Sequence, residues 1–213
     1  MLKAVIILIF NFYPVFMFCQ SNYFIGGIFF NVNGIHLEGN NDIYWQNSNG
    51  RTLGAGGLSA GLSVKHYLNK KYYFKLEIRY VQKGSVYEYF NPYTTRSFEV
   101  LRLNYMEIPA SIGYKFQVYK RTLFFESGFA YAKLFSSEKK INEYAILTNI
   151  ENAESFKDTD ISWFTCVKFP INKIENKILL GLRFSYSLFT IHEYDKLKNI
   201  VYGIQMDYKF NNK

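Results

Sequence analysis

Histidine and carboxylate side chains are the groups of this chain that could perform general acid–base chemistry. The sequence has three histidines: His36, His66 and His192. Glu38 stands close to His36, and Glu193 and Asp195 follow His192. A histidine that activates a serine and is oriented by a carboxylate performs ester hydrolysis or acyl transfer. No nucleophile stands at a distinctive spacing here, and such triads are recognised by geometry rather than by sequence order. We therefore expect no catalytic centre and keep this chemistry as the alternative.

Metal, cofactor and disulfide chemistry find no support in the sequence. Lys3, a short apolar run and the polar residues from Gln20 onward are the layout of a secretory signal peptide, which we place at residues 1–19. A lipidated Cys19 is the alternative, which the bulky residues before it disfavour. Removal of the signal peptide leaves Cys166 alone, so we expect no internal disulfide, no metal cluster and no cofactor. Residues 20–213 then form one domain.

The segment from Tyr72 to Gly84 alternates between apolar and charged residues. Its even positions from 72 to 80 are apolar or aromatic, whereas Lys75, Glu77 and Arg79 occupy odd positions; Lys83 continues the charged side after the exception at Val81. A period of two places alternate side chains on opposite faces of a β-strand. One face suits lipid and the other is ionic, which is typical of a transmembrane β-barrel with a polar interior.

Composition excludes a helical membrane protein. Hydrophobic residues make up 49% and aromatic residues 20% of the chain, yet the mean hydropathy is only −0.11. A membrane helix needs about 20 consecutive apolar residues, and the one candidate run, Val5–Phe18, is shorter and interrupted. The chain has 25 basic and 17 acidic residues. No basic run exceeds two residues, so we expect no nucleic acid partner.

The rest of the chain shows the same alternation in seven further segments. The expected strands are 24–33, 53–67, 72–84, 100–116, 123–135, 161–169, 178–188 and 200–210. The phase changes within 100–116, which predicts a β-bulge near Met106–Glu107. Long connections at Glu38–Arg51, Ser85–Glu99, Ser136–Asp160 and His192–Lys198 alternate with short ones, as extracellular loops alternate with periplasmic turns in outer-membrane barrels.

These patterns predict an all-β protein: an antiparallel up-and-down transmembrane β-barrel of about eight strands. Charges on the inner parity should form a mutually neutralising lumen network. Its expected members are Lys75, Glu77, Arg79, Arg102, Glu107, Glu126, Arg183, Asp207 and Lys209. The expected lipid-facing residues are Phe74, Leu76, Ile78, Leu180, Leu182, Phe184, Ile204 and Met206. An eight-stranded barrel is just wide enough for side chains to fill its interior, so no solute pore is expected.

Two segments resemble a known family. Tyr105–Pro109, followed by Gly113–Phe116, looks like the signature of the PorT-like outer-membrane β-barrel family. The segment Gly61–Gly84 resembles the preceding hairpin, and residues 125–129 and 183–187 match less sharply. The family tends to have glycine after an aspartate where this chain has Ile161 after Asp160. The resemblance implies an eight-stranded outer-membrane barrel and no specific activity.

We therefore expect an outer-membrane protein with a structural or surface-interaction role through its extracellular loops. Two readings compete with this one: a lipid A hydrolase or acyltransferase that uses His36 or His192, and a soluble lipocalin-like barrel with its aromatic face inward. The expected partners are outer-membrane lipid, lipopolysaccharide, a protein at the loops and the barrel-assembly machinery, which recognises a terminal aromatic such as Phe210. We expect a monomer. Tyr23, Tyr72, Tyr73, Tyr114 and Tyr208 should contribute to a periplasmic aromatic girdle.

Overall fold

The computed structural model contains β-strands, turns and connecting segments. It describes residues 24–39, 51–89, 97–119, 121–143, 146–151, 156–171, 177–192 and 196–210. The expected signal peptide and Tyr23 therefore lie outside the described residues. The strands are β1 (Phe24–Glu38), β2 (Arg51–Leu53), β3 (Ala55–Tyr67), β4 (Tyr72–Tyr89), β5 (Ser97–Val118), β6 (Arg121–Glu143), β7 (Ile146–Glu151), β8 (Thr159–Pro170), β9 (Ile178–Ser187) and β10 (Lys198–Lys209).

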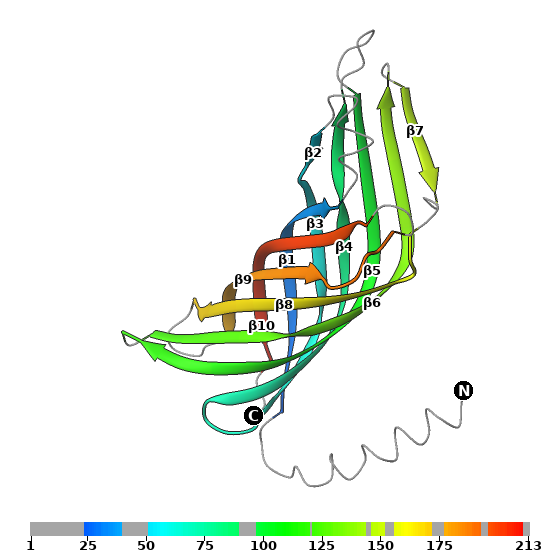
Figure 1. Cartoon of the computed structure of the whole chain (residues 1–213). Coiled ribbons are helices and arrows are strands. Elements are labelled where there is room, and N and C mark those ends of the chain that lie inside the picture. The colour runs from blue at the N-terminus through cyan, green and yellow to red at the C-terminus, as the bar shows by residue number, and fades with distance from the viewer. Residues whose placement is uncertain are drawn as a thin grey trace, which may run out of the picture.

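Eight of these strands close into a barrel in which every neighbouring pair is antiparallel. Sequential strands pair along β3, β4, β5, β6, β8, β9 and β10, with β6 reaching β8 past the short β7. The first and last barrel strands then close the ring, because β1 pairs with both β10 and β3. Figure 1 shows the strands curving around a common interior. The expected fold class is confirmed.

Strand β4 has the two faces that its sequence predicts. Lys75 and Glu77 are buried, whereas Phe74 is 41% and Ile78 is 54% exposed. A lipocalin-like barrel requires the opposite arrangement, so that reading is wrong. Among the described residues, the structure has no helix with the length and hydropathy of a membrane span.

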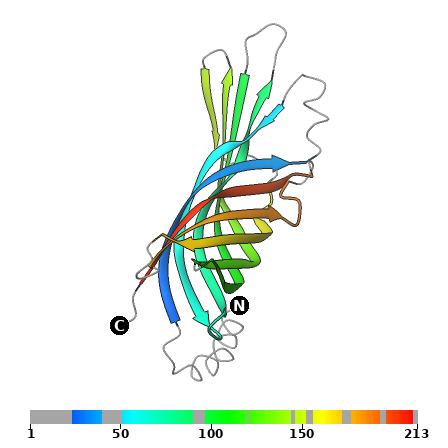
Figure 2. The same cartoon turned by 90° about the vertical axis from the view of Figure 1, so that its left-hand side faces the viewer.

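Two expected loops are largely sheet. The segment Ser85–Glu99 is mostly a hairpin in which β4 continues to Tyr89 and β5 begins at Ser97. Within Ser136–Asp160, β6 continues to Glu143 and pairs with β7. The sequence missed these strands because their residues do not alternate between lipid and lumen types. Together with β2, these extensions form a projecting sheet above the ends of β1, β8, β9 and β10 (Figures 1 and 2).

The predicted bulge lies on a different strand. Along β5 the inner parity is unbroken, from Leu101, Leu103 and Tyr105 to Glu107, all of which are buried. The register shift instead lies on β6, where Asn104 pairs with Ser136 but Tyr105 pairs with Leu134, leaving Phe135 as the extra residue. The prediction was wrong because it assumed that apolar residues face lipid throughout, whereas this part of β5 is apolar on its inner side.

Candidate functional site: the charged lumen

The lower half of the lumen is organised around Glu126 on β6. Its carboxylate lies 3.2 Å from Lys65 Nζ, 3.5 Å from Lys75 Nζ and 2.8 Å from Lys168 Nζ. Tyr73 donates a 2.9 Å hydrogen bond to the same carboxylate. Side chains from β3, β4 and β8 therefore meet one buried acid on β6.

Asp207 on β10 is the second acid of this layer. It lies 2.7 Å from Lys168 Nζ and 3.4 Å from Lys75 Nζ. Lys75 also pairs with Glu77, which in turn lies 3.1 Å from Arg183 Nη1. The Arg183 guanidinium stacks on the Phe164 ring, with its carbon 3.8 Å from the ring centroid, an arrangement that suits a planar cation.

The upper half of the network joins β4, β5 and β8. Arg79 Nε lies 2.7 Å from Glu107, and Lys83 Nζ lies 2.6 Å from the same carboxylate. Lys83 also lies 2.8 Å from Asp160. Ser187 and Asn199 donate hydrogen bonds of 2.8 and 3.0 Å to Asp160.

The buried network is nearly neutral. Its cations are Lys65, Lys75, Arg79, Lys83, Lys168 and Arg183, and its anions are Glu77, Glu107, Glu126, Asp160 and Asp207. Removing one member of such a set is costly because the remaining charges stay buried without their partner. The arrangement fills this part of the barrel with charges that neutralise one another.

The structure places most of the expected lumen residues inside the barrel, with two differences. Arg102 is exposed, so its assignment to the lumen was wrong. It has the outward parity of Met106 and Ile108, because Leu101 and Leu103 occupy the inner side of β5 at this level. Lys209 is half-buried, and its Nζ lies 4.7 Å from the centroid of the Phe124 ring.

Four charged members of the network were not predicted, although the sequence carried a signal for each. Lys65 has the parity of the small inward residues Ser59 and Ser63 on β3. Lys83 continues the charged side of β4. Asp160 and Lys168 share the inner parity of β8, whose outer parity carries apolar residues.

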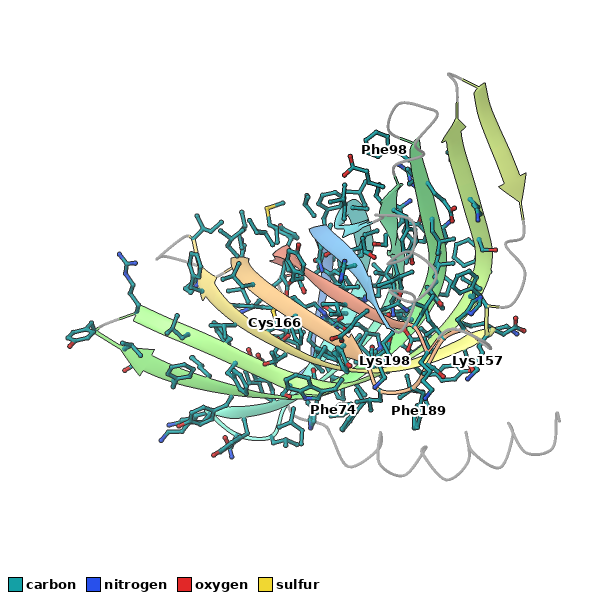
Figure 3. The ribbon with its side chains drawn as sticks, turned by 45° about the horizontal axis from the view of Figure 1, so that its top comes forward. Phe74, Phe98, Lys157, Cys166, Phe189 and Lys198 are labelled. Carbon is teal, nitrogen blue, oxygen red and sulfur yellow. The ribbon has the colours of Figure 1, made fainter. Side chains whose placement is uncertain are left out.

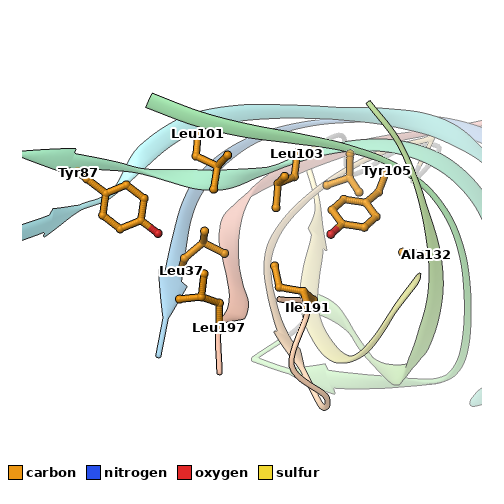
Figure 4. Close-up of a cluster of buried hydrophobic side chains, with 9 residues drawn as sticks. Leu37, Tyr87, Leu101, Leu103, Tyr105, Ala132, Ile191 and Leu197 are labelled. Atoms are coloured by element: carbon orange, nitrogen blue, oxygen red, sulfur yellow. The ribbon is translucent and has the colours of Figure 1, made fainter. Parts of the chain in front are cut away.

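A cluster of buried apolar side chains lies next to the upper half of the charged network, where Lys83 Nζ lies 4.9 Å from the centroid of the Tyr105 ring (Figure 4). Its buried members are Leu37, Val81, Tyr87, Leu101, Leu103, Tyr105, Ala132, Ile191 and Leu197. Ile191 and Leu197 come from the β9–β10 connection, which folds over the lumen, and Phe156 packs against the cluster. Two backbone hydrogen bonds hold Ile191 in place. Lys157 N–H donates to Ile191 C=O at 2.8 Å, and Ile191 N–H donates to Leu197 C=O at 2.8 Å.

A smaller apolar cluster lies in the other half of the barrel, next to Lys65. Tyr73, Phe124 and Leu179 are buried there, and Tyr67 packs against them. Tyr73 therefore lies in the lumen, and its expected place in the aromatic girdle was wrong. Tyr72 and Tyr114 are outside, with ring centroids 4.9 Å apart.

The lipid side carries the residues that alternation predicts. Those with exposed side chains are Phe74, Leu76, Ile78, Leu182, Phe184, Ile204, Met206 and Phe210, whereas Leu180 is partly buried. Figure 3 shows the side chains on both sides of the curved sheet, with Phe74 labelled.

The histidines lie in structural settings. His192 forms a β-bridge with Phe156, and the two rings lie 4.9 Å apart. His66 packs on Phe24 at 4.6 Å, and His36 is half-buried on β1 opposite Ile200. Glu193 and Asp195 lie outside the described residues. In the part of the chain that the structure describes, no group of three His, Cys, Asp or Glu side chains could hold a metal ion, and Cys166 is a free, buried thiol.

Comparisons with solved structures return small membrane barrels. Ail, the attachment invasion locus protein of Yersinia pestis, is 10% identical, with 89% of this chain and 100% of that chain covered at a TM-score of 0.46. Neisserial surface protein A is 10% identical, with 87% and 97% covered at a TM-score of 0.47. OprG of Pseudomonas aeruginosa is 10% identical, with 89% and 95% covered at a TM-score of 0.45. Likenesses this distant carry no argument about function.

Sequence comparison is the basis for the family. None of the curated proteins matches the chain. Residues 18–193, however, match the family described as "Outer membrane protein beta-barrel domain". This range takes in the described strands from β1 to β9, and β10 closes the ring outside it. The chain belongs to this family of bacterial outer-membrane β-barrels.

Proposed function

We propose that the protein is an integral outer-membrane barrel with a surface-interaction role, and that it is neither a solute pore nor an enzyme. The observation that carries this proposal is the lumen, in which buried ion pairs lie between two apolar clusters. The buried charges of the described residues pair with one another, whereas some buried amide groups, such as that of Asn31, have no hydrogen-bond partner. The paired charges support a filled interior rather than a path for a substrate or a permeant solute.

The projecting sheet is the surface that we assign to this role. It consists of β2, β7 and the outer ends of β4, β5 and β6, and it rises beyond the barrel rim (Figure 2). Binding residues collect on segments that a rigid scaffold positions. Here the sheet of the barrel continues into the projecting segment itself. Tyr87 on β4 pairs with Glu99 on β5, and Arg102 on β5 pairs with Glu138 on β6. Such a surface recognises a partner with little ordering cost.

The remaining expectations form part of the same proposal. We infer a protein partner at the projecting sheet, lipopolysaccharide around the outer rim, and recognition of Phe210 by the barrel-assembly machinery. The exposed aromatic side chain of Phe210 supports the last of these. We also propose export through a cleaved signal peptide, a monomeric barrel and membership of the PorT-like subgroup, which the segment Tyr105–Phe116 supports.

The reconstituted barrel should conduct no ions. The ion-pair layers lie between two apolar clusters, so we expect that hydrated ions would have to break buried pairs to pass. Single-channel recording in planar bilayers tests this expectation against a known porin as the positive control. Stable unitary currents from the purified barrel would contradict the filled interior.

Shortening the β6–β7 hairpin should abolish the biological activity while the barrel stays folded. We would replace residues 139–152 with Asn-Gly, a two-residue hairpin turn. The replacement retains Phe156 and Lys157, which hold the cover of the upper cluster. The measurement is complementation of a deletion-strain phenotype, with heat-modifiable migration on gels as the test of folding.

Histidine variants separate this role from lipid A chemistry. His36→Ala and His192→Ala should complement fully and should leave the mass profile of lipid A unchanged. A change in lipid A that depends on either histidine would favour an enzymatic role over the surface-interaction role. Full complementation by the shortened barrel would show that the projecting sheet is not needed for the activity.

A further inference from the structure

The periplasmic end of the barrel is strongly basic. Short turns lie on the periplasmic side of outer-membrane barrels, and in this protein they are the β3–β4, β5–β6 and β8–β9 connections. The described basic residues of this end are Lys70, Lys71, Lys115, Arg121, Lys177 and Lys209. The acids of the described residues near this end, Glu126 and Asp207, face the lumen and contact lysines there. The same turns contain Lys120, Lys173 and one acid, Glu175, outside the described residues.

Backbone hydrogen bonds place some of these basic residues opposite one another on adjacent segments. Lys115 N–H donates a 2.7 Å hydrogen bond to the carbonyl of Lys71, and Lys209 N–H donates a 2.9 Å bond to the carbonyl of Lys177. Like charges on adjacent strands repel. Among the described residues, no ion pair neutralises Lys70, Lys71, Lys115 or Arg121. An external anion would therefore stabilise this end of the barrel.

Each short turn also exposes one large apolar or aromatic side chain. Leu68 is 62%, Tyr119 is 98% and Ile171 is 56% exposed. These side chains lie beyond the strand ends and next to the basic residues. A surface that combines apolar tips with lysines suits the headgroup region of a lipid leaflet, where lysine stems lie along apolar surface and their charges reach phosphate.

Two of the turns are built to hold this arrangement. The Asn69 side chain accepts hydrogen bonds of 2.8 Å from the backbone N–H groups of Lys71 and Tyr72, which fixes the turn that carries Leu68 and Lys70. Tyr119 has a φ of +46°, a left-handed conformation in which Asn or Gly is usual and a bulky residue is uncommon. A tyrosine is thus retained at an unfavourable position, at the most exposed point of its turn.

We propose that the periplasmic rim binds anionic phospholipid headgroups of the inner leaflet, through Lys70, Lys71, Lys115 and Arg121 together with the exposed side chains of Leu68, Tyr119 and Ile171. The rim therefore selects phosphatidylglycerol-type lipids over zwitterionic ones. This inference is independent of the role proposed for the projecting sheet, which lies at the other end of the barrel.

Lipid selectivity of the reconstituted barrel tests the proposal. Electron spin resonance with spin-labelled phosphatidylglycerol and phosphatidylcholine gives their relative association with the protein. A basic residue near an anionic surface contributes on the order of fivefold in affinity. We expect phosphatidylglycerol to be preferred several-fold, and we expect Lys70→Gln/Lys71→Gln/Arg121→Gln to bring the preference close to one. Tyr119→Asn should weaken the preference without loss of heat-modifiable folding.

The matched control neutralises three exposed lysines at the opposite end: Lys133→Gln/Lys157→Gln/Lys196→Gln. This control should keep most of the preference. Equal loss in both triple variants, or no preference in the unaltered protein, would overturn the proposal. Soluble poly-L-glutamate serves as the second probe; if it binds the rim while phosphatidylglycerol shows no preference, the occupant is an acidic protein rather than lipid.

Discussion

Replacing Ile78 with arginine should lower the free energy of unfolding by roughly 2–4 kcal/mol, because a cation on the lipid face costs most near the bilayer midplane. Ile78 lies midway between Tyr72 and Gly84 on β4, and its side chain is 54% exposed on the outer face. Urea titration of the barrel folded into lipid vesicles measures the change.

Tyr208→Arg provides the depth-matched control for that experiment. Tyr208 is also exposed on the lipid side, but it lies two residues from the periplasmic end of the described chain. Near an interface the same substitution costs about 0–1 kcal/mol. If Ile78→Arg and Tyr208→Arg lowered the free energy of unfolding equally, the bilayer midplane would not lie at the level of Ile78.

Replacing Glu126 with glutamine should destabilise the barrel by about 3–5 kcal/mol, because it leaves buried cations without a shared partner. Three lysines contact this carboxylate, and it accepts the hydroxyl hydrogen bond of Tyr73. The same urea titration applies. Adding Lys65→Met to Glu126→Gln should recover part of the loss, since one unpaired cation is then removed.

A partly exposed ion pair supplies the comparison for Glu126. Lys139 lies 2.9 Å from Glu99, and their side chains are 32% and 11% exposed. Pairs in contact with water contribute about 0–1 kcal/mol, so Lys139→Gln should have a small effect. If Glu126→Gln were as mild as Lys139→Gln, the three lysines would not depend on this carboxylate.

Much of the barrel could be predicted from sequence because lipid and lumen impose opposite chemistry on alternate residues. On β4 the contrast between Leu76 and Glu77 is complete, so strand, faces and fold class follow from a single segment. The same rule placed Glu107, Arg183 and Asp207 on the inner face. Alternation does not predict which of the inward charges pair with one another. Lys83, for example, contacts Asp160, which is 77 residues away in the sequence.

The prediction of inward and outward faces failed where the interior of the barrel changes from charged to apolar side chains. Leu101 and Leu103 are apolar and inward, so a rule that equates apolar with lipid assigned them and Arg102 to the wrong faces. The projecting strands failed for a related reason. Above the bilayer neither face meets lipid, so Ser85–Glu99 loses the alternation and resembles a loop. Pairing with β5 nevertheless continues without a register break.

The extra residue at Phe135 also sets a rule for exchanging segments between related barrels. Below it, even-numbered positions of β6 such as Ala132 face the interior; above it, the buried position is the odd-numbered Ser137. In a segment taken from above Phe135 the odd-numbered residues face inward, and in a segment taken from below it the even-numbered residues do. A chimera of two related barrels therefore keeps its inner and outer faces only when both chains are cut on the same side of this residue. Because of the bulge, the outer part of β6 has the opposite parity of inward and outward residues from the membrane-spanning part, and the two parts can be separated at Phe135.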